Sequence, residues 1–527
     1  MSSEHTERDR SSLPGSEGAT GSPVAELLLV AAPAVVTMTS YTLMQFVDKW
    51  ILSNLGADEV AGAGNGGIIA FVPGALIMGL VTVVNTYVSQ NLGAGRAERG
   101  AAYAWNGLWM VLALWAALLL PLAAFLPEVF SAMRSLMGVS EPPARLLELE
   151  TTYGRIMTAG LITMLLARAL HHYFYGVHRA WVVMVSALTA NVCNVGLTWV
   201  LALGYEPLGI PSLGVAGAAW GTVIGGAIEF IIPMAIFLSP KYARELHTRV
   251  AWRPSLEHVK DILRIGWPAG AMFGNEIVCW WVMSTGLVGH FDPPNGVATA
   301  TAAGWITLQY MHLSFMPAVG LSIAVTAVVG KYIGAGRPDI AARRTWLGLS
   351  IATVYMGFAA MAFLLFRVPM MKLFTGGYDP AVAEEVVRIG ASILIVAAAF
   401  QLFDAVAITL SGALRGAGDT IWPGIVTVIL SWTFIVGGGR LLIEVAPELG
   451  PSGPWIGAAT FITLLALAML ARFVGGKWRS MSVVKDGPEV AATAPDTAQG
   501  VIPELPGTDV PDLDPDGGSP TQGSPSA

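Results

Sequence analysis

Long apolar segments follow one another along almost the whole chain, and each is long enough to cross a lipid bilayer. A membrane-spanning helix needs about 20 mostly apolar residues in succession, and such runs recur from Ala25 to Lys477. Charged residues make up only 12% of the 527 residues, whereas soluble globular proteins carry roughly 25%. The predicted spans are residues 25–52, 64–90, 100–126, 150–174, 180–203, 213–239, 262–289, 298–330, 341–366, 387–413, 420–445 and 455–476. The sequence therefore predicts an all-α polytopic membrane protein with twelve transmembrane helices.

The two ends of the chain differ from this apolar core. Residues 1–24 and 477–527 are polar and rich in Gly, Pro and Ser, so they cannot bury a core, and we expect both to be disordered tails. Eight acidic residues and no Lys or Arg follow Lys485, so the net charge of −7 comes from the C-terminal tail. The rest is close to neutral, which predicts no nucleic-acid partner. We expect no cleaved signal peptide, because no short apolar segment with a small-residue cleavage site precedes the first span.

The twelve spans divide into two similar halves. The longest polar break within the core, residues 240–261, is a predicted linker between an N-terminal lobe (25–239) and a C-terminal lobe (262–476). Gly79 and the Gly-Ala-Gly-Arg sequence at 93–96 recur as Gly320 and 334–337, each ending the second span of its half. We interpret each such sequence as a glycine turn with an arginine among lipid headgroups. Two six-helix bundles related by an internal repeat are a common plan of secondary transporters.

The basic residues predict the orientation in the membrane, because Lys and Arg near span ends stay on the cytoplasmic side. Alternate loops carry most of them, including the linker. These residues are Arg96, Arg99, Arg179, Lys241, Arg244, Arg249, Arg253, Lys260, Lys331, Arg337, Arg343, Arg344, Arg415, Lys477, Arg479 and Lys485. We therefore expect a multi-pass protein of the cell (inner or plasma) membrane, with both termini in the cytoplasm.

Three acidic residues that lie within predicted spans and away from loops are the main candidates: Asp48, Glu276 and Asp404. A carboxylate within the bilayer costs at least a few kcal/mol, so it normally faces a cavity and has a function there. Projection of the repeat places Tyr41 opposite Glu276 and Met164 opposite Asp404, so neither acid is repeated. Two carboxylates in one cavity either bind a cation or share a proton. Glu229, in the sixth span, is a weaker candidate, and Lys49 offers Asp48 a local ion pair.

These residues, in this order and spacing, resemble the MATE (multidrug and toxic compound extrusion) family, NorM-like branch. Residues 45–48 (Gln-Phe-Val-Asp) resemble its first-helix acidic motif, and Trp267-Pro268 with Asn275-Glu276 resemble its seventh-helix motif. Residues 401–406 and 412–416 resemble the tenth-helix signature, and 194–197 with 213–219 resemble the fifth and sixth helices. The resemblance covers residues 25–476.

The resemblance implies a secondary active antiporter that exports organic, often cationic, compounds in exchange for Na⁺ or H⁺ by alternating access. It implies a coupling-cation site at Glu276 and Asp404, with Asp48 less certain, and no cofactor or other metal site. The implied cavity residues are Tyr310, Gln401, Asn194 and Thr198. Thr198 stands where some members carry a second fifth-helix acid, which favours the C-terminal site. We expect a monomer whose partners are small organic molecules and the bilayer.

Two other functions remain open from the sequence. A flippase for lipid-linked oligosaccharides or polysaccharides would line its cavity with Lys or Arg to hold a pyrophosphate, whereas the mid-span charges at the best motifs here are acidic. A membrane-embedded enzyme would need a constellation such as HExxH, which the sequence lacks. We therefore predict a transporter rather than an enzyme.

Overall fold

The computed structural model describes residues 22–137, 143–293, 297–376 and 378–484. Within these ranges the chain is almost entirely helical and contains no β-strand. Most of the two predicted tails lies outside the described residues. Packed structure nevertheless extends past residue 476, because Trp478 is fully buried and the Val483 backbone N–H donates to Gln90 Oε1 (2.8 Å).

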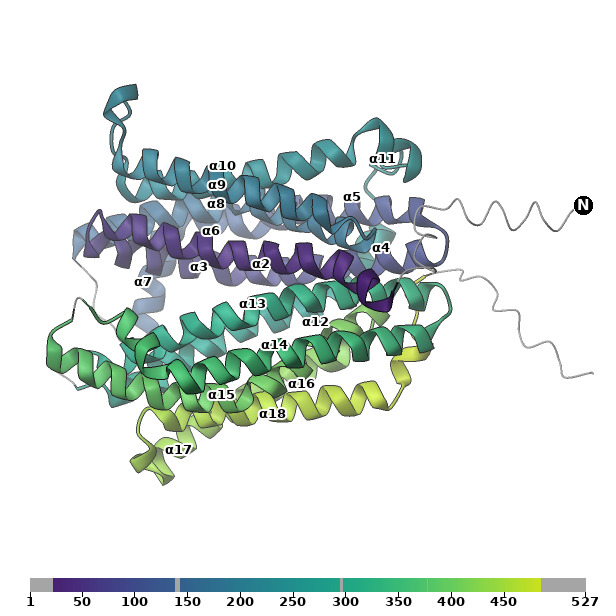
Figure 1. Ribbon diagram of the computed structural model, residues 1–527. Coiled ribbons are helices and arrows are strands. Elements are labelled where there is room, and N and C mark those ends of the chain that lie inside the picture. Colours follow the sequence, from purple (N-terminus) through teal and green to yellow (C-terminus); the bar gives the residue numbers. More distant parts are fainter. Residues whose placement is uncertain (1–21, 138–142, 294–296, 377, 485–527) are drawn as a thin grey trace, which may run out of the picture. The chain divides into compact units, whose positions relative to one another are not determined.

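Six membrane-length segments form the N-terminal bundle (Figure 1). The second is divided at Thr82, whose hydroxyl bonds back to the Gly79 carbonyl (2.7 Å), a contact that bends helices. The segments are α2 (Pro23–Ser53), α3 (Ala57–Val81) with α4 (Val83–Gly93), α5 (Ala97–Leu114) with the π-helix η2 (Trp115–Leu119) and α6 (Leu120–Ala124), α8 (Ala144–Gly176), α9 (Ala180–Leu203) and α10 (Gly214–Phe237). Shorter elements are α7 (Leu126–Met137), η3 (Glu206–Leu208) and α11 (Pro240–Glu245).

Six further segments form the C-terminal bundle (Figure 1). They are α12 (Leu256–Trp281) with the π-helix η4 (Val282–Leu287), α13 (Thr299–Gly334), α14 (Pro338–Leu373), α15 (Pro380–Ala417), α16 (Ile421–Leu430) with the π-helix η6 (Ser431–Gly438) and α17 (Gly439–Val445), and α18 (Ser452–Val474). The short 3₁₀ elements are η5 (Gly289–Phe291), η7 (Pro447–Leu449) and η8 (Lys477–Ser480). Pro338 and Pro380 start their helices at the position where a missing N–H costs nothing.

Ten of the twelve segments are apolar enough over their length to qualify as membrane spans by composition alone, among the described residues. The other two, α8 and α12, have 33 and 26 residues and pack within the same bundles, α8 against α3 and α10 and α12 against α16. They are less apolar because each carries five charged residues, among them Arg168 of α8 and Glu276 of α12. The prediction of twelve helices in two six-helix bundles is confirmed.

The repeated glycines lie where the two bundles meet. A Cβ added to Gly93 would lie 1.8 Å from the Lys331 carbonyl oxygen, and one added to Gly334 would lie 1.9 Å from the Gln90 carbonyl oxygen. Each of these glycines thus presses on the backbone of the other bundle at equivalent positions of the repeat. We call this end of the molecule, which carries residues 93–96 and 334–337, the GAGR end.

A second pair of repeated glycines makes the same reciprocal contact further along the bundles. Gly79 of α3 lies against Gly270 of α12, and Gly320 of α13 lies against Val35 of α2. In each case an added Cβ would come within 2.7 Å of a backbone atom of the other bundle. The repeated glycines are therefore the residues that allow the two bundles to approach backbone to backbone.

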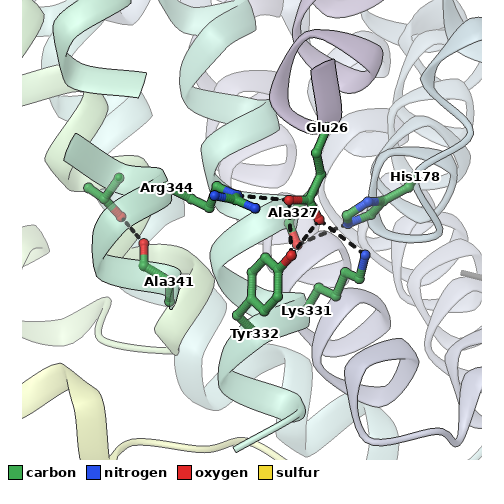
Figure 2. Close-up of polar contacts among 8 residues, drawn as sticks. Glu26, His178, Ala327, Lys331, Tyr332, Ala341 and Arg344 are labelled. Carbon is green, nitrogen blue, oxygen red and sulfur yellow. Dashed lines mark hydrogen bonds and ion pairs between the residues drawn. The ribbon is translucent and has the colours of Figure 1, made fainter. Parts of the chain in front are cut away.

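An ion-pair network joins the bundles at the GAGR end (Figure 2). The Glu26 carboxylate of α2 accepts hydrogen bonds from Lys331 Nζ (3.2 Å), Tyr332 Oη (2.7 Å) and Arg344 Nε (2.8 Å), all in the C-terminal bundle. Glu26 is buried, and a buried carboxylate is tolerated because these donors satisfy it. Beside it, His178 Nε2 lies 3.2 Å from the Ala327 carbonyl oxygen.

Further hydrogen bonds close the same end. The Gln90 amide donates to the Gly416 carbonyl (2.9 Å), and the Thr86 hydroxyl donates to the Arg415 carbonyl (2.8 Å). The described hydrogen bonds between the two bundles all lie in this half of the helices. Near the far end of α2 the contact between bundles is instead an edge-to-face pair of Phe46 and Phe374 (6.4 Å between ring centroids). The bundles are thus closed against each other at the GAGR end.

Candidate functional site

The structure places Glu276 and Asp404 within electrostatic range of each other in the C-terminal bundle. Glu276 lies on α12 and Asp404 on α15, and the two carboxyl groups interact electrostatically. Gly274 packs on Leu76 of the other bundle. Glu276 lies about 200° further round the helix, so it points away from that contact. Glu276 is exposed and interacts with Trp280, whereas Asp404 is half-buried.

The neighbour of Glu276 fixes this part of α12 to the rest of the bundle. The Asn275 amide donates to Ser431 Oγ (2.8 Å), and its carbonyl oxygen accepts from Trp432 Nε1 (2.7 Å). Ser431 and Trp432 begin the π-helix η6, and the π-helix η4 follows Glu276 by one and a half turns. π-helical turns within α-helices are frequent at functional sites. Glu276 therefore precedes one π-helical segment, and its neighbour Asn275 contacts another.

Two of the predicted cavity residues make structural contacts in the same bundle. The buried Gln401 amide donates to Ser314 Oγ (2.8 Å), which joins α15 to α13. The Tyr310 hydroxyl donates to the Met370 carbonyl (2.6 Å), and its ring packs edge-to-face on Phe374. Tyr310 thus joins α13 to α14. These contacts hold the helices that carry and surround Asp404.

Asp48 lies apart from the acidic pair, on α2 of the N-terminal bundle. Its Oδ1 atom is buried without a hydrogen-bond partner, and the carboxyl group interacts electrostatically with Tyr153 of α8. In the part of the chain that the structure describes, no ion pair joins Asp48 to Lys49. Lys49 is exposed and interacts instead with His312 of the C-terminal bundle. The adjacent lysine therefore does not neutralise Asp48.

Asn194 and Thr198 lie on α9, also in the N-terminal bundle. The Asn194 amide donates weakly to Thr222 Oγ1 (3.3 Å), and its Oδ1 atom is buried without a hydrogen-bond partner. Thr198 Oγ1 is likewise buried and unpartnered. Asn194 lines a small pocket whose other walls are Tyr41, Met44, Met164, Ala190, Asn191, Thr222, Gly225, Gly226 and Glu229.

The pocket wall includes two members of a buried polar cluster, Tyr41 and Glu229. The sequence offered Glu229 only as a weaker candidate and did not predict the cluster. The Tyr41 hydroxyl of α2 donates a short hydrogen bond to Glu229 of α10, and His171 Nδ1 of α8 lies 3.6 Å from the same carboxylate oxygen. The Arg168 guanidinium lies over the Tyr41 ring, 4.1 Å from its centroid. The internal repeat is the sequence feature that could have pointed to this cluster, because Tyr41 and Met164 occupy the positions equivalent to Glu276 and Asp404.

Comparison with known proteins identifies the family to which this architecture belongs. The MatE family model matches residues 33–200 and 271–437, one segment in each bundle. This chain belongs to the MATE family. The double match agrees with the internal repeat, and membership of a transporter family confirms the prediction that the chain is not an enzyme.

Other MATE-family proteins match over nearly their whole length. "Probable multidrug resistance protein NorM" of Deinococcus radiodurans is 30% identical over 462 residues, which is 88% of this chain and 97% of the relative. "Multidrug resistance protein NorM" of Burkholderia vietnamiensis is 29% identical over 453 residues, 84% of this chain and 92% of the relative. A crystal structure of a MATE in complex with MaL6 superposes with a TM-score of 0.76 at 21% identity, covering 87% of this chain and 98% of that one.

Proposed function

We propose that this MATE-family transporter exports organic, often cationic, compounds in exchange for Na⁺ or H⁺. The observation that carries the proposal is the electrostatic pairing of Glu276 and Asp404 within the membrane-spanning part of one bundle. Two carboxylates in such a place repel each other unless a cation or a proton lies between them. A coupling ion would therefore stabilise the arrangement in which the Glu276 and Asp404 carboxyl groups lie near each other. Loss of the ion would favour movement of α12 away from α15. The names of the relatives, as multidrug resistance proteins, support export of organic molecules.

The transport cycle that we propose alternates access by moving the two bundles against each other. The hydrogen bonds at the GAGR end would break when the cavity opens to that side, and the Phe46–Phe374 contact would break when it opens to the other side. A flippase for pyrophosphate-linked lipids would need cations where this chain carries Glu276 and Asp404, so those residues favour cationic substrates.

The test uses purified protein in liposomes loaded with a fluorescent organic cation such as ethidium. A Na⁺ gradient and a pH gradient are imposed separately, each with the membrane potential clamped. We expect dye movement against its gradient with at least one of the two ions, and none when both gradients are collapsed. Dye movement that is equal with and without gradients would contradict the coupled mechanism.

We further propose that the GAGR end faces the cytoplasm, because Arg and Lys gather in the loops of that end. Cysteines introduced at Arg249 in the linker and at Glu206 in η3, at the opposite ends of α10, test this orientation. We expect an impermeant thiol reagent added to intact cells to modify the cysteine at residue 206 and not that at residue 249. The reverse pattern would place the linker outside the cell and invert the topology.

A further inference from the structure

We propose that the N-terminal bundle holds a proton-binding site of its own, in which Glu229 Oε1 and His171 Nδ1 share one proton. This site is separate from the acidic pair of the C-terminal bundle. The role of this site in transport rests on the proposed antiport function. Proton binding at the site does not, because it can be measured without transport.

The hydrogen bonds around His171 assign its tautomer. Ser186 Oγ lies 3.3 Å from His171 Nε2 and also donates to the Val183 carbonyl (2.9 Å). A hydroxyl has one proton, and the Val183 carbonyl is the closer of its two possible acceptors. We assign the proton to that carbonyl, so Ser186 accepts from His171 and Nε2 carries the imidazole proton. In the neutral ring the Nδ1 atom then has a free lone pair. This buried Nδ1 has no hydrogen-bond partner among the described residues.

That lone pair faces another acceptor. Glu229 Oε1 lies 3.6 Å from His171 Nδ1, and both side chains are almost completely buried, with 6% and 1% of their surface exposed. Two acceptors held this close without a proton repel each other and leave the nitrogen unsatisfied, which is costly in a buried site. One proton placed between them satisfies both atoms. The two atoms must approach by several tenths of an ångström for the proton to bond to both, because 3.6 Å exceeds the length of a hydrogen bond. Tyr41 donates to the same carboxylate oxygen.

The surrounding charges make this proton exchangeable rather than permanent. Without it, the Glu229 carboxylate is balanced by Arg168, and with it the site carries one net positive charge. The groups that interact with the pair are Tyr41 from α2 and Arg168, His172 and Tyr175 from α8. The helix α9 contributes neutral side chains: Ser186, Asn191 and Asn194. A nearby cation would therefore expel the proton by like-charge repulsion.

A proton suits the site better than a metal ion. Hard cations take about six oxygen ligands, whereas Glu229 is the one carboxylate lining the pocket and Arg168 repels cations from its Tyr41 wall. No group of three or more metal-ligating His, Cys, Asp or Glu side chains exists in the described ranges. A proton needs one lone pair, which His171 supplies.

The place of the site in the repeat supports a role in transport. Tyr41 and Met164, both in the pocket wall, are the repeat counterparts of Glu276 and Asp404. The N-terminal bundle thus has a polar pocket where the C-terminal bundle has its acidic pair, although the acid comes from α10. If the proposed export function is correct, a cationic substrate that approaches this pocket would displace the proton by charge repulsion, as antiport requires.

The test counts protons taken up by purified, detergent-solubilised protein as the pH falls from about 8 to about 5, the range in which an ordinary histidine titrates. The parent protein is the Glu276→Gln/Asp404→Asn variant, in which the acidic pair of the C-terminal bundle cannot contribute. We expect Glu229→Gln and His171→Gln, each in this parent, to take up about one proton fewer. The variant with both changes should also lose about one, because the two residues share it.

The outcomes separate the shared proton from other roles of these residues. Uptake equal to that of the parent in both variants would mean that the cluster is only structural, and a loss of two protons in the double variant would mean two independent sites. Tyr41→Phe keeps the ring under Arg168 and removes only the hydrogen bond, so it should keep the proton count and change the pH of uptake. If Glu229→Gln fails to fold, judged by size exclusion, His171→Gln and Tyr41→Phe still decide.

Discussion

Replacing Glu276 by Gln, or Asp404 by Asn, should reduce gradient-driven export to the level of dye-loaded liposomes that contain no protein. Both changes keep the shape of the side chain and remove its charge, so packing is preserved while the pair loses its ability to hold a cation or exchange a proton. The carboxyls interact with each other across α12 and α15, so removal of either one should disable the pair. The measurement is ethidium export from liposomes under the gradient that drives the unaltered protein.

Matched controls come from exposed acids of the same bundle. Glu385 forms a surface ion pair with Arg388 at the start of α15, and Asp339 pairs with Arg479 at the start of α14. Exposed pairs of this kind contribute about 0–1 kcal/mol, so Glu385→Gln and Asp339→Asn should export at the unaltered rate. Binding of the dye to solubilised protein should survive in Glu276→Gln, if cation and substrate occupy different bundles.

A substitution of Asp48 tests which of the two bundles holds the coupling ion. We expect Asp48→Asn to lower export less than either C-terminal change, because Thr198 stands in place of a second acid on α9. If Asp48→Asn abolishes export while Glu276→Gln and Asp404→Asn export normally, the coupling ion belongs to the N-terminal bundle.

The sequence was sufficient for features that depend on local pattern or on the repeat. Apolar length predicted the twelve segments, although α8 and α12 are the least apolar, and a constant offset predicted that Gly93 and Gly334 are equivalent. Their turn function is visible at Gly95 and Gly336, whose φ angles are +72° and +69°. The sequence did not reveal that Gly93 and Gly334 also form the contact between bundles, because nothing local encodes which backbone lies opposite.

The cluster of Tyr41, Arg168, His171 and Glu229 could not be predicted from the sequence for the same reason. Arg168 and His171 lie on α8, Tyr41 on α2 and Glu229 on α10, so their meeting depends on how three helices pack. Each residue alone has an ordinary interpretation: a snorkelling arginine, an interfacial histidine, a core tyrosine and a lone acid. Only their distances in the folded bundle show that a carboxylate oxygen and an imidazole nitrogen face each other.

The reciprocal glycine contacts predict a second large effect, on the equilibrium between the two arrangements of the bundles. Gly93→Ala or Gly334→Ala places a Cβ within 2 Å of a carbonyl oxygen of the other bundle, and that oxygen cannot move without its helix. Overpacking of this kind costs about 1–3 kcal/mol. The bundles can avoid the whole cost by separating at the GAGR end, so the closed arrangement should lose roughly tenfold or more in population.

The measurement is the rate at which a thiol reagent modifies a cysteine placed at Thr86, a buried residue that bonds across the interface to the Arg415 carbonyl. The background lacks the two native cysteines through Cys193→Ala and Cys279→Ala. We expect modification to become roughly tenfold faster with Gly93→Ala or Gly334→Ala, together with loss of export. Gly196→Ala on α9 is the control, because an added Cβ there meets nothing within 4 Å. Unchanged modification in both interface variants would show that the closed arrangement does not depend on glycine at these positions, since their helices would then have yielded without opening the GAGR end.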